Sequence, residues 1–553
     1  MASRTKGLRA LAALTMLIVA CTSEDDDAAS SPSTTEPTAT EDAPTQAAAE
    51  TTSSTTATET SLSPGGTDEG GTVARVTREQ VDAALSEIDG LVGAEMERSG
   101  VPGVAVAVVY DDEVVFAEGY GVRKVETEDP VSPETVFQLA SLSKPITGTA
   151  LAGLVSDGTI SWDEPVHPYA PDLIFSDPWV TDHVTFADLY SHRSGLPGDI
   201  GDPLEIMGFT RDEILARFRL VPLNPFRASY AYTDFGMTAG GDAAAKAAGV
   251  PFEQMVAEQL FEPAGMTSSS ARYADFLVRP DRTTLHVRVD GKWVPGPERQ
   301  PDAQAPAGGI SSSVNDVATW VRLQLNGGTL DGEEIISEEA LLPTHTPQIV
   351  KPPAPTYDGP AHFYGLGWIL DQDHLGYFRW SHSGAFTQGA ATNITLLPLE
   401  GLGVVVLTNG MPIGVPETLA DQIIDQIVTG NETRDWAAYW TDTFSHLSVE
   451  DPALSEMPEP PTPARPLDAY LGSYANDFYG TFEVVADGTG IALVQGPARV
   501  TSPLTHWDGD TFTFVPASAT PGIRAPLKFT VGPDGLASAI TIPDPDFGTL
   551  QRV

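Results

Sequence analysis

The chain has 553 residues, a formal net charge of −46 and a single cysteine. Its length predicts more than one domain, and its strong negative charge argues against nucleic acid or an anionic surface as a partner. One cysteine excludes a disulfide within the chain and a zinc site built from several cysteines.

Residues 1–20 have the pattern of a secretory signal. Arg4, Lys6 and Arg9 precede a short apolar stretch, which is too short to span a membrane. The stretch ends in Ile18-Val19-Ala20-Cys21, which resembles a bacterial lipobox, the signal in which the cysteine becomes lipidated. We therefore expect an extracytoplasmic protein that is anchored to the bacterial cell membrane through a lipid on Cys21. The alternative is a signal that is cleaved elsewhere and leaves a spare thiol.

Residues 21–74 are rich in Ser, Thr, Ala, Pro and acidic residues, and residues 22–73 contain no Lys or Arg. Such a composition buries too little apolar surface to offset the entropy lost on folding. We expect this segment to be a disordered acidic tether.

Residues 75–435 have the pattern of one large α/β (α+β) domain. Apolar residues recur with helical spacing from Arg78 to Glu97, and the apolar runs 104–110 and 114–117 then predict a buried hairpin that turns at Asp111 and Asp112. A second hairpin is predicted over residues 393–408, followed by a helix over residues 413–430. Strands at both ends predict one antiparallel sheet flanked by helices, with a mostly helical subdomain inserted between them.

The tetrad Ser141-Leu142-Ser143-Lys144 carries a candidate nucleophile. If a helix begins near Ser141, the spacing of three residues puts the hydroxyl and the amine on one face. A serine hydroxyl is a weak nucleophile until a neighbouring base takes its proton, and burial makes a lysine available as that base by disfavouring its charged form. The tetrad alone is a common spacing on surface helices.

Residues 75–430 resemble the serine β-lactamase and penicillin-binding-protein-like family, nearest its class C and serine-esterase branch. Six motifs occur in the family's order. They are Ser141-x-x-Lys144, residues 189–197 (LYSHRSGLP), residues 232–237 (YTDFGM), residues 262–267 (EPAGMT), residues 307–312 (AGGISS) with Asn315-Asp316, and His382-Ser383-Gly384. The resemblance implies the β-lactamase/transpeptidase-like fold.

The resemblance also implies roles for the motif residues. Ser141 is expected to attack a carbonyl and become acylated, and Lys144 and Tyr232 are expected to move its proton; the sequence leaves open which of the two acts as base. His382, Ser383 and Gly384 are expected to lie on an edge strand that lines the cleft. The backbone N–H groups of Ser141 and Ala385 are then the expected oxyanion hole.

Two departures from the family pattern affect the expected substrate. Asp234 stands where the β-lactamases have asparagine, and an ionised aspartate only accepts hydrogen bonds, although it can brace Lys144. His382 replaces the lysine of dedicated β-lactamases, and histidine is mostly neutral above about pH 6.5. Both changes favour an esterase, amidase or peptidase over an efficient β-lactamase.

Three further residues of these motifs are assigned structural roles. Tyr230 lies two residues before Tyr232, but Tyr232 puts Asp234 in the family's register. His192 and Asp316 are expected to support the architecture, with Asn315-Asp316 opening a helix that Asp316 caps.

The last part of the chain has a different pattern. Trp436, Trp440 and Phe444 recur with helical spacing, and a Pro-rich stretch at 458–463 follows, so residues 436–465 are predicted to form a helix and a linker. Residues 466–553 are predicted to form a small all-β, barrel-like domain with strands at 480–485, 491–494, 511–515, 527–531 and 537–542.

The function expected from the sequence is a lipid-anchored serine hydrolase that forms an acyl-serine on an ester, amide or D-amino-acid peptide, with weak or no β-lactamase activity. No cofactor, metal or nucleic acid is expected, and the partners are a small-molecule or peptide substrate and the membrane. The alternative is a catalytically silent receptor or cell-envelope binding module on the same fold. The altered Tyr-x-Asn motif favours this alternative, and the intact Ser-x-x-Lys motif opposes it.

Overall fold

The computed structural model describes residues 75–352, 359–445, 447, 449, 451–516 and 522–553. The predicted signal over residues 1–20, the tether over 21–74 and Cys21 lie outside the described residues. Among the helices of the described part, none has the length and apolar character needed to cross a membrane.

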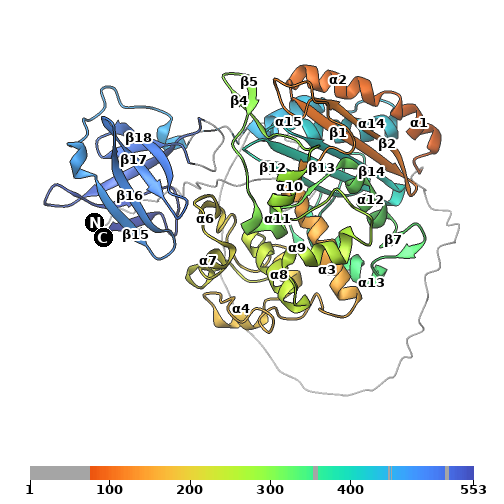
Figure 1. The fold of residues 1–553 in the computed structure, drawn as a ribbon, viewed down its shortest axis with the longest axis horizontal. Coiled ribbons are helices and arrows are strands. Elements are labelled where there is room, and N and C mark those ends of the chain that lie inside the picture. Colours follow the sequence, from red (N-terminus) through yellow and green to blue (C-terminus); the bar gives the residue numbers. More distant parts are fainter. Residues whose placement is uncertain (1–74, 353–358, 446, 448, 450, 517–521) are drawn as a thin grey trace, which may run out of the picture. The chain divides into compact units, whose positions relative to one another are not determined.

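An antiparallel eight-stranded sheet forms the centre of the main domain (Figure 1). Its order is β2-β1-β14-β13-β12-β11-β10-β9, so the first hairpin of the domain pairs with the last one. Its strands are β1 (Gly103–Tyr110), β2 (Glu113–Gly121), β9 (Ile349–Val350), β10 (Phe363–Tyr364), β11 (Ile369–Gln372), β12 (Phe378–Phe386), β13 (Ala390–Leu397) and β14 (Leu402–Thr408). The prediction of one sheet formed from both ends of the domain is confirmed.

The first hairpin differs from its prediction in burial. Asp111 and Asp112 turn the chain with φ of 50° and 64°, a left-handed pair that suits a two-residue hairpin turn. β1 is buried, but β2 is the outermost strand and half of it faces solvent. The prediction of a hairpin is confirmed, and the prediction that both of its strands are buried is wrong.

Helices cover both faces of the sheet. They do so because successive apolar side chains along β1 and β14 point to opposite faces, so that each face is apolar. Val104, Val106 and Val108 pack with α1 (Arg78–Leu85), α2 (Ile88–Ser99) and α14 (Val415–Thr429) on one face. Ala105 and Ala107 face the larger core on the other. The predicted single helix over 78–97 is two helices, since Ser86 ends α1 and its hydroxyl donates to Ala83 O at 2.7 Å.

The segment between β2 and β9 is mostly helical, as predicted. Its longer helices are α3 (Ser143–Ser156), α8 (Asp234–Ala248) and α12 (Val314–Leu325). The shorter ones are α4 (Pro178–His183), α5 (Phe186–Tyr190), α6 (Asp202–Ile206), α7 (Arg211–Leu215), α9 (Phe252–Val256), α10 (Tyr273–Val278), α11 (Ala305–Gly308) and α13 (Glu338–Leu341). Short strand pairs β3 (Phe137–Gln138) with β6 (Ser311–Ser312), β4 (His286–Val289) with β5 (Lys292–Pro295), and β7 (Thr329–Leu330) with β8 (Glu333–Glu334) complete it.

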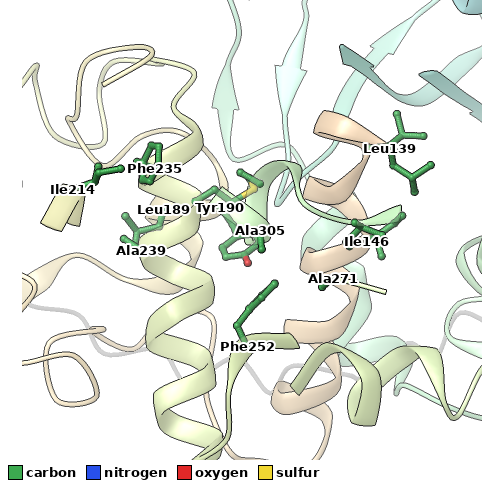
Figure 2. Close-up of a cluster of buried hydrophobic side chains, with 14 of the residues drawn as sticks. Leu139, Ile146, Leu189, Tyr190, Ile214, Phe235, Ala239, Phe252, Ala271 and Ala305 are labelled. Carbon is green, nitrogen blue, oxygen red and sulfur yellow. The ribbon is translucent and has the colours of Figure 1, made fainter. Parts of the chain in front are cut away.

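Tyr190 packs between α3 and α8, the two helices that carry the predicted catalytic motifs. Figure 2 shows its ring between the helix with Ile146 and the helix with Phe235 and Ala239. A Cβ at Gly240 would lie 2.9 Å from the Tyr190 ring, so the glycine allows the close approach. This packing fixes α8 relative to α3.

The C-terminal part contains α15 and a closed barrel. α15 (Trp436–Ser445) packs on α14, where the indole N–H groups of Trp436 and Trp440 donate to Asp425 and Asp421 at 2.7 and 2.8 Å. The barrel strands are β15 (Gly472–Asn476), β16 (Gly480–Asp487), β17 (Gly490–Gln495), β18 (Val500–Asp508), β19 (Thr511–Phe514), β20 (Ala525–Val531), β21 (Ala537–Thr541) and β22 (Thr549–Arg552). All five predicted strands are present; β15, β18 and β22 were not predicted.

Candidate active site

Ser141 lies in a tight turn that leads into α3. The turn is a 3₁₀ helix, η1 (Ala140–Leu142), and α3 begins only at Ser143. Because residues three apart eclipse one another in a 3₁₀ turn, Ser141 and Lys144 still lie on one face. The Thr392 hydroxyl of β13 donates to Leu139 O at 2.8 Å, and this bond fastens the turn to the sheet.

Lys144 is completely buried and is surrounded by three oxygen atoms. Its Nζ donates to Ser141 Oγ at 2.9 Å and to Ala307 O at 3.0 Å. It also forms an ion pair with Asp234 Oδ1 at 2.6 Å. An ammonium group has three N–H bonds and no acceptor, so these three oxygens suit the charged form of Lys144 in the resting protein.

Tyr232 lies beside this pair. Lys144 Nζ is 4.6 Å from the centre of the Tyr232 ring. Burial and the negative charge of Asp234 raise the pKa of Tyr232 well above its ordinary value, and the Ser141 hydroxyl opposes this rise by hydrogen bonding. The Tyr232 hydroxyl has no other hydrogen-bond partner among the described residues. Tyr230 instead packs its ring against His192 and Tyr364.

β12 brings its second half close to Ser141. β11 pairs with β12 only as far as Ser381, so the strand beyond it has one open edge. A Cβ at Gly384 would lie 2.2 Å from Leu139 O and 3.0 Å from Leu142 N, so only glycine lets the strand approach the turn so closely. Ala385 follows on the same edge and is half-buried. This placement is compatible with the oxyanion hole expected at Ser141 and Ala385.

His382 is fully buried and both of its ring nitrogens have partners within the protein. Nδ1 donates to Ser383 O at 2.7 Å, and Nε2 accepts from the Tyr364 hydroxyl at 3.0 Å. Burial and the charge of Lys144 lower the pKa of His382 to about 3. The ring is therefore uncharged and leaves no nitrogen free for the substrate contact predicted from the sequence.

The Ser383 side chain points to the opposite face of the strand from His382 and Gly384. It pairs directly with Asn393, whose amide donates to Ser383 Oγ at 3.0 Å. On that face it also hydrogen-bonds to Glu417 of α14. Alternation along the strand therefore turns the Ser383 side chain away from the face that carries His382 and Gly384, and only its backbone lies on the strand that was predicted to line the cleft.

Asp316 supports the fold, but not as the helix cap that was predicted. α12 begins at Val314, and its N-cap is Ser313, whose hydroxyl accepts from Asp316 N at 3.2 Å. The Asp316 carboxylate accepts from Ser268 N and the Ser269 hydroxyl at 2.7 and 2.8 Å. It thus fastens the residues after the 262–267 motif to α12.

Two acids near Asp234 were not predicted as site residues. Burial and the negative charge of Asp234 raise the pKa of Asp199 to about 8, and they raise that of Asp202 well above its ordinary value. The Asp199 carboxyl is therefore mostly protonated at neutral pH. Nothing in the sequence distinguishes them from the many surface acids of this chain. Within the described ranges, no three His, Cys, Asp or Glu side chains are grouped to hold a metal ion.

Comparisons with known proteins agree with this fold. Residues 88–429 match the family model "Beta-lactamase", and residues 456–552 match "Domain of unknown function (DUF3471)". The chain is similar to an octameric penicillin-binding protein homologue from Pyrococcus abyssi, with a TM-score of 0.55 and 22% identity over 84% of this chain and 100% of that one.

Two curated relatives match this chain over most of their own lengths. Unguisins hydrolase ungD of Aspergillus violaceofuscus is 26% identical over 82% of this chain and 87% of its own. The D-alanyl-D-alanine-carboxypeptidase/endopeptidase AmpH of Escherichia coli is 25% identical over 60% of this chain and 86% of its own. With the family model covering most of the chain, the protein belongs to the serine β-lactamase and penicillin-binding-protein-like family of hydrolases.

Proposed function

We propose that this protein hydrolyses an ester, an amide or a D-amino-acid peptide through an acyl enzyme on Ser141. The observation that carries the proposal is the buried contact of Lys144 Nζ with Ser141 Oγ at 2.9 Å, beside the Tyr232 ring. A buried lysine against a serine hydroxyl is costly to maintain, and it serves acyl transfer directly.

In the acylation step, Ser141 Oγ bonds to the carbonyl carbon of the substrate. The charged Lys144 stabilises the negative charge that develops on Ser141 Oγ as it loses its proton. Because the raised pKa of Tyr232 disfavours a stable phenolate, Tyr232 acts as a relay. It accepts the Ser141 proton and passes its own proton to the leaving-group oxygen or nitrogen, which departs as the tetrahedral intermediate collapses.

Deacylation reverses the same proton path. A water molecule attacks the acyl carbon and gives a proton to Tyr232, which returns its own proton to Ser141 Oγ. The acid product then leaves, and Lys144 and Asp234 have kept their charges throughout. Backbone N–H groups of Ser141 and Ala385 would hold the oxyanion in both steps.

The charges around Ser141 support this choice of substrate class. A β-lactam carries a carboxylate, and His382 is uncharged with both nitrogens occupied. Asp234 adds a negative charge. These features favour esters and amides that carry no carboxylate beside the scissile bond. The name of AmpH makes peptides the natural amide class to test, and a cyclic peptide, which has no terminal carboxylate, separates the effect of the amide from that of the charge.

A substrate panel tests this assignment. Nitrophenyl esters, D-Ala-D-Ala peptides, a cyclic peptide and nitrocefin should be compared with the wild type and the Ser141→Ala variant. Turnover of an ester or peptide that disappears in Ser141→Ala, with nitrocefin turned over at least 100-fold more slowly, is expected. Nitrocefin as the best substrate would contradict the proposed substrate class.

We also propose that the protein is held outside the cell membrane by a lipid on Cys21. The charged, short apolar segment before the lipobox-like residues 18–21 supports this. The wild-type chain should partition into detergent and yield a lipidated N-terminal peptide by mass spectrometry. A Cys21→Ser variant that still partitions into detergent would contradict the anchor.

A further inference from the structure

We infer that His192 is a positioning residue that sets the place of the Tyr232 hydroxyl. This inference rests on the function proposed above, since it concerns the relay role of Tyr232. His192 itself touches no reacting atom; it acts through the backbone on either side of Tyr232 and through the face of its ring.

The first observation is a pair of hydrogen bonds that bracket Tyr232. His192 O accepts from Ala231 N at 3.0 Å. His192 Nδ1 accepts from Thr233 N at 3.2 Å. One residue therefore holds the backbone N–H groups of the two residues on either side of Tyr232, and thereby restricts where its Cα lies and how its side chain leaves the backbone.

The second observation is the packing of the imidazole ring. Its centre lies 4.6 Å from that of Tyr232 and 4.7 Å from that of Tyr364. The Tyr364 hydroxyl in turn donates to His382 Nε2. The other ring nitrogen of His382, Nδ1, donates to Ser383 O. The Tyr232 ring is thus confined between His192 and the Lys144 ammonium.

The third observation is that His192 stays neutral and is itself fixed. Burial, followed by the charge of Lys144, lowers its pKa well below the ordinary value. Since Nδ1 accepts a hydrogen bond, the proton of the neutral ring lies on Nε2. His192 has a left-handed φ of 57°, in a turn that Asp188 anchors through ion pairs with Arg193 and Arg227 at 2.8 and 2.7 Å.

These contacts matter because the Tyr232 hydroxyl has no other fixed partner. Its oxygen makes no hydrogen bond of normal geometry among the described residues, and the Ser141 hydroxyl interacts with it only in a looser geometry. Its position is therefore set by its backbone and by its ring neighbours. A displacement of about 1 Å at a reacting group costs roughly 100-fold in rate. The two hydrogen bonds of His192 on either side of Tyr232 therefore influence the rate of proton transfer.

The test compares two substitutions of His192 in the full chain. In His192→Asn, the amide oxygen can replace Nδ1 as the acceptor for Thr233 N, whereas His192→Leu keeps apolar bulk and loses the acceptor. We expect kcat for a nitrophenyl ester to fall about 100-fold in His192→Leu and about 10-fold or less in His192→Asn. KM should be unchanged in both variants, because no substrate contact is removed.

His345→Leu is the matched control. His345 is also buried, its ring also packs on aromatic side chains, and its Nε2 also has no partner in the described part of the chain. Its ring contacts are to Trp368 and Trp380, and among the described residues no hydrogen bond or ring contact joins it to residues 231–233. We expect the melting temperature of this variant to fall as that of His192→Leu does, whereas its kcat should equal that of the wild type.

Three outcomes would overturn the inference. They are an unchanged kcat in folded His192→Leu, equal losses of kcat in His192→Leu and His345→Leu, and no rescue by His192→Asn. A wild-type protein whose Ser141 forms no adduct with a fluorophosphonate overturns the proposed function and this inference together. A reactive wild type with any of the three outcomes overturns the inference alone.

Discussion

Replacing Glu417 with glutamine is expected to flatten the pH dependence of the protein's stability. Glu417 lies in the first turn of α14, on the far face of β12 from the candidate active site. Burial raises its pKa from 4.5 to about 7, the Ser383 hydrogen bond opposes the rise, and the charge of Asp421 adds to it. Its Oε2 has no partner among the described residues.

The sign follows from the direction of this shift. A carboxyl with a raised pKa in the folded state binds its proton more tightly there than in the unfolded chain. The stabilising contribution of Glu417 to the free energy of unfolding is therefore complete below about pH 4.5 and is lost as the pH rises through about 7. The difference between these two values amounts to about 3 kcal/mol, at about 1.4 kcal/mol per pH unit.

Melting temperatures at about pH 5 and pH 8.5 measure this effect in the full chain. At roughly 2 °C per kcal/mol for a large domain, the wild type should lose about 6 °C more than Glu417→Gln between the two pH values. Because each protein is compared with itself at two pH values, any change in stability that the glutamine causes equally at both pH values cancels. The exposed Glu79→Gln serves as control and should behave as the wild type. If the melting temperatures of Glu417→Gln and the wild type fall in parallel, the reasoning about this buried acid is refuted.

Three further substitutions probe the site directly. Tyr232→Phe should fold normally and lose about 10²–10⁴-fold in kcat, measured by stopped-flow acylation; a loss below tenfold would exclude the relay. Lys144→Met leaves a buried carboxylate without its cation, so urea denaturation should show a loss of about 3–5 kcal/mol, and stability within 1 kcal/mol of the wild type would count against the ion pair. Gly384→Ala puts a Cβ within 2.2 Å of Leu139 O and should abolish Ser141 labelling, whereas Gly90→Ala, with open space around its Cβ, should label normally.

The sequence predicts most of the fold because long apolar runs and turn residues mark the large elements. Both hairpins and the helices α3 and α14 are readable in this way. The strands β9, β10 and β11 are two to four residues long, and no periodicity can be recognised at that length. The break between α1 and α2 falls at Ser86, whose hydroxyl bonds to a backbone carbonyl, and helical spacing does not reveal such a local bond.

The candidate site is predictable only in part, for a related reason. Ser141, Lys144, Tyr232 and Asp234 come from motifs with family order, and the structure brings these four side chains together. The orientation of Ser383 was missed because a motif gives residue order, whereas strand alternation decides which face each side chain takes. Tyr364 was missed because the bond from its hydroxyl to the His382 ring joins β10 and β12, two strands that are not neighbours in the sheet.

The central claim is that Ser141 is a nucleophile activated in a buried site, and intact-protein mass spectrometry tests it most directly. The full chain, and its Ser141→Ala variant, should be exposed to a fluorophosphonate and to a fluorescent penicillin, and the modified peptide should be located. We predict one fluorophosphonate adduct on Ser141, absent from Ser141→Ala, and slow or absent labelling by the penicillin. A folded wild-type protein that gains no Ser141-dependent mass with either probe would contradict the nucleophilic role of Ser141 and favour a catalytically silent binding protein on the same fold.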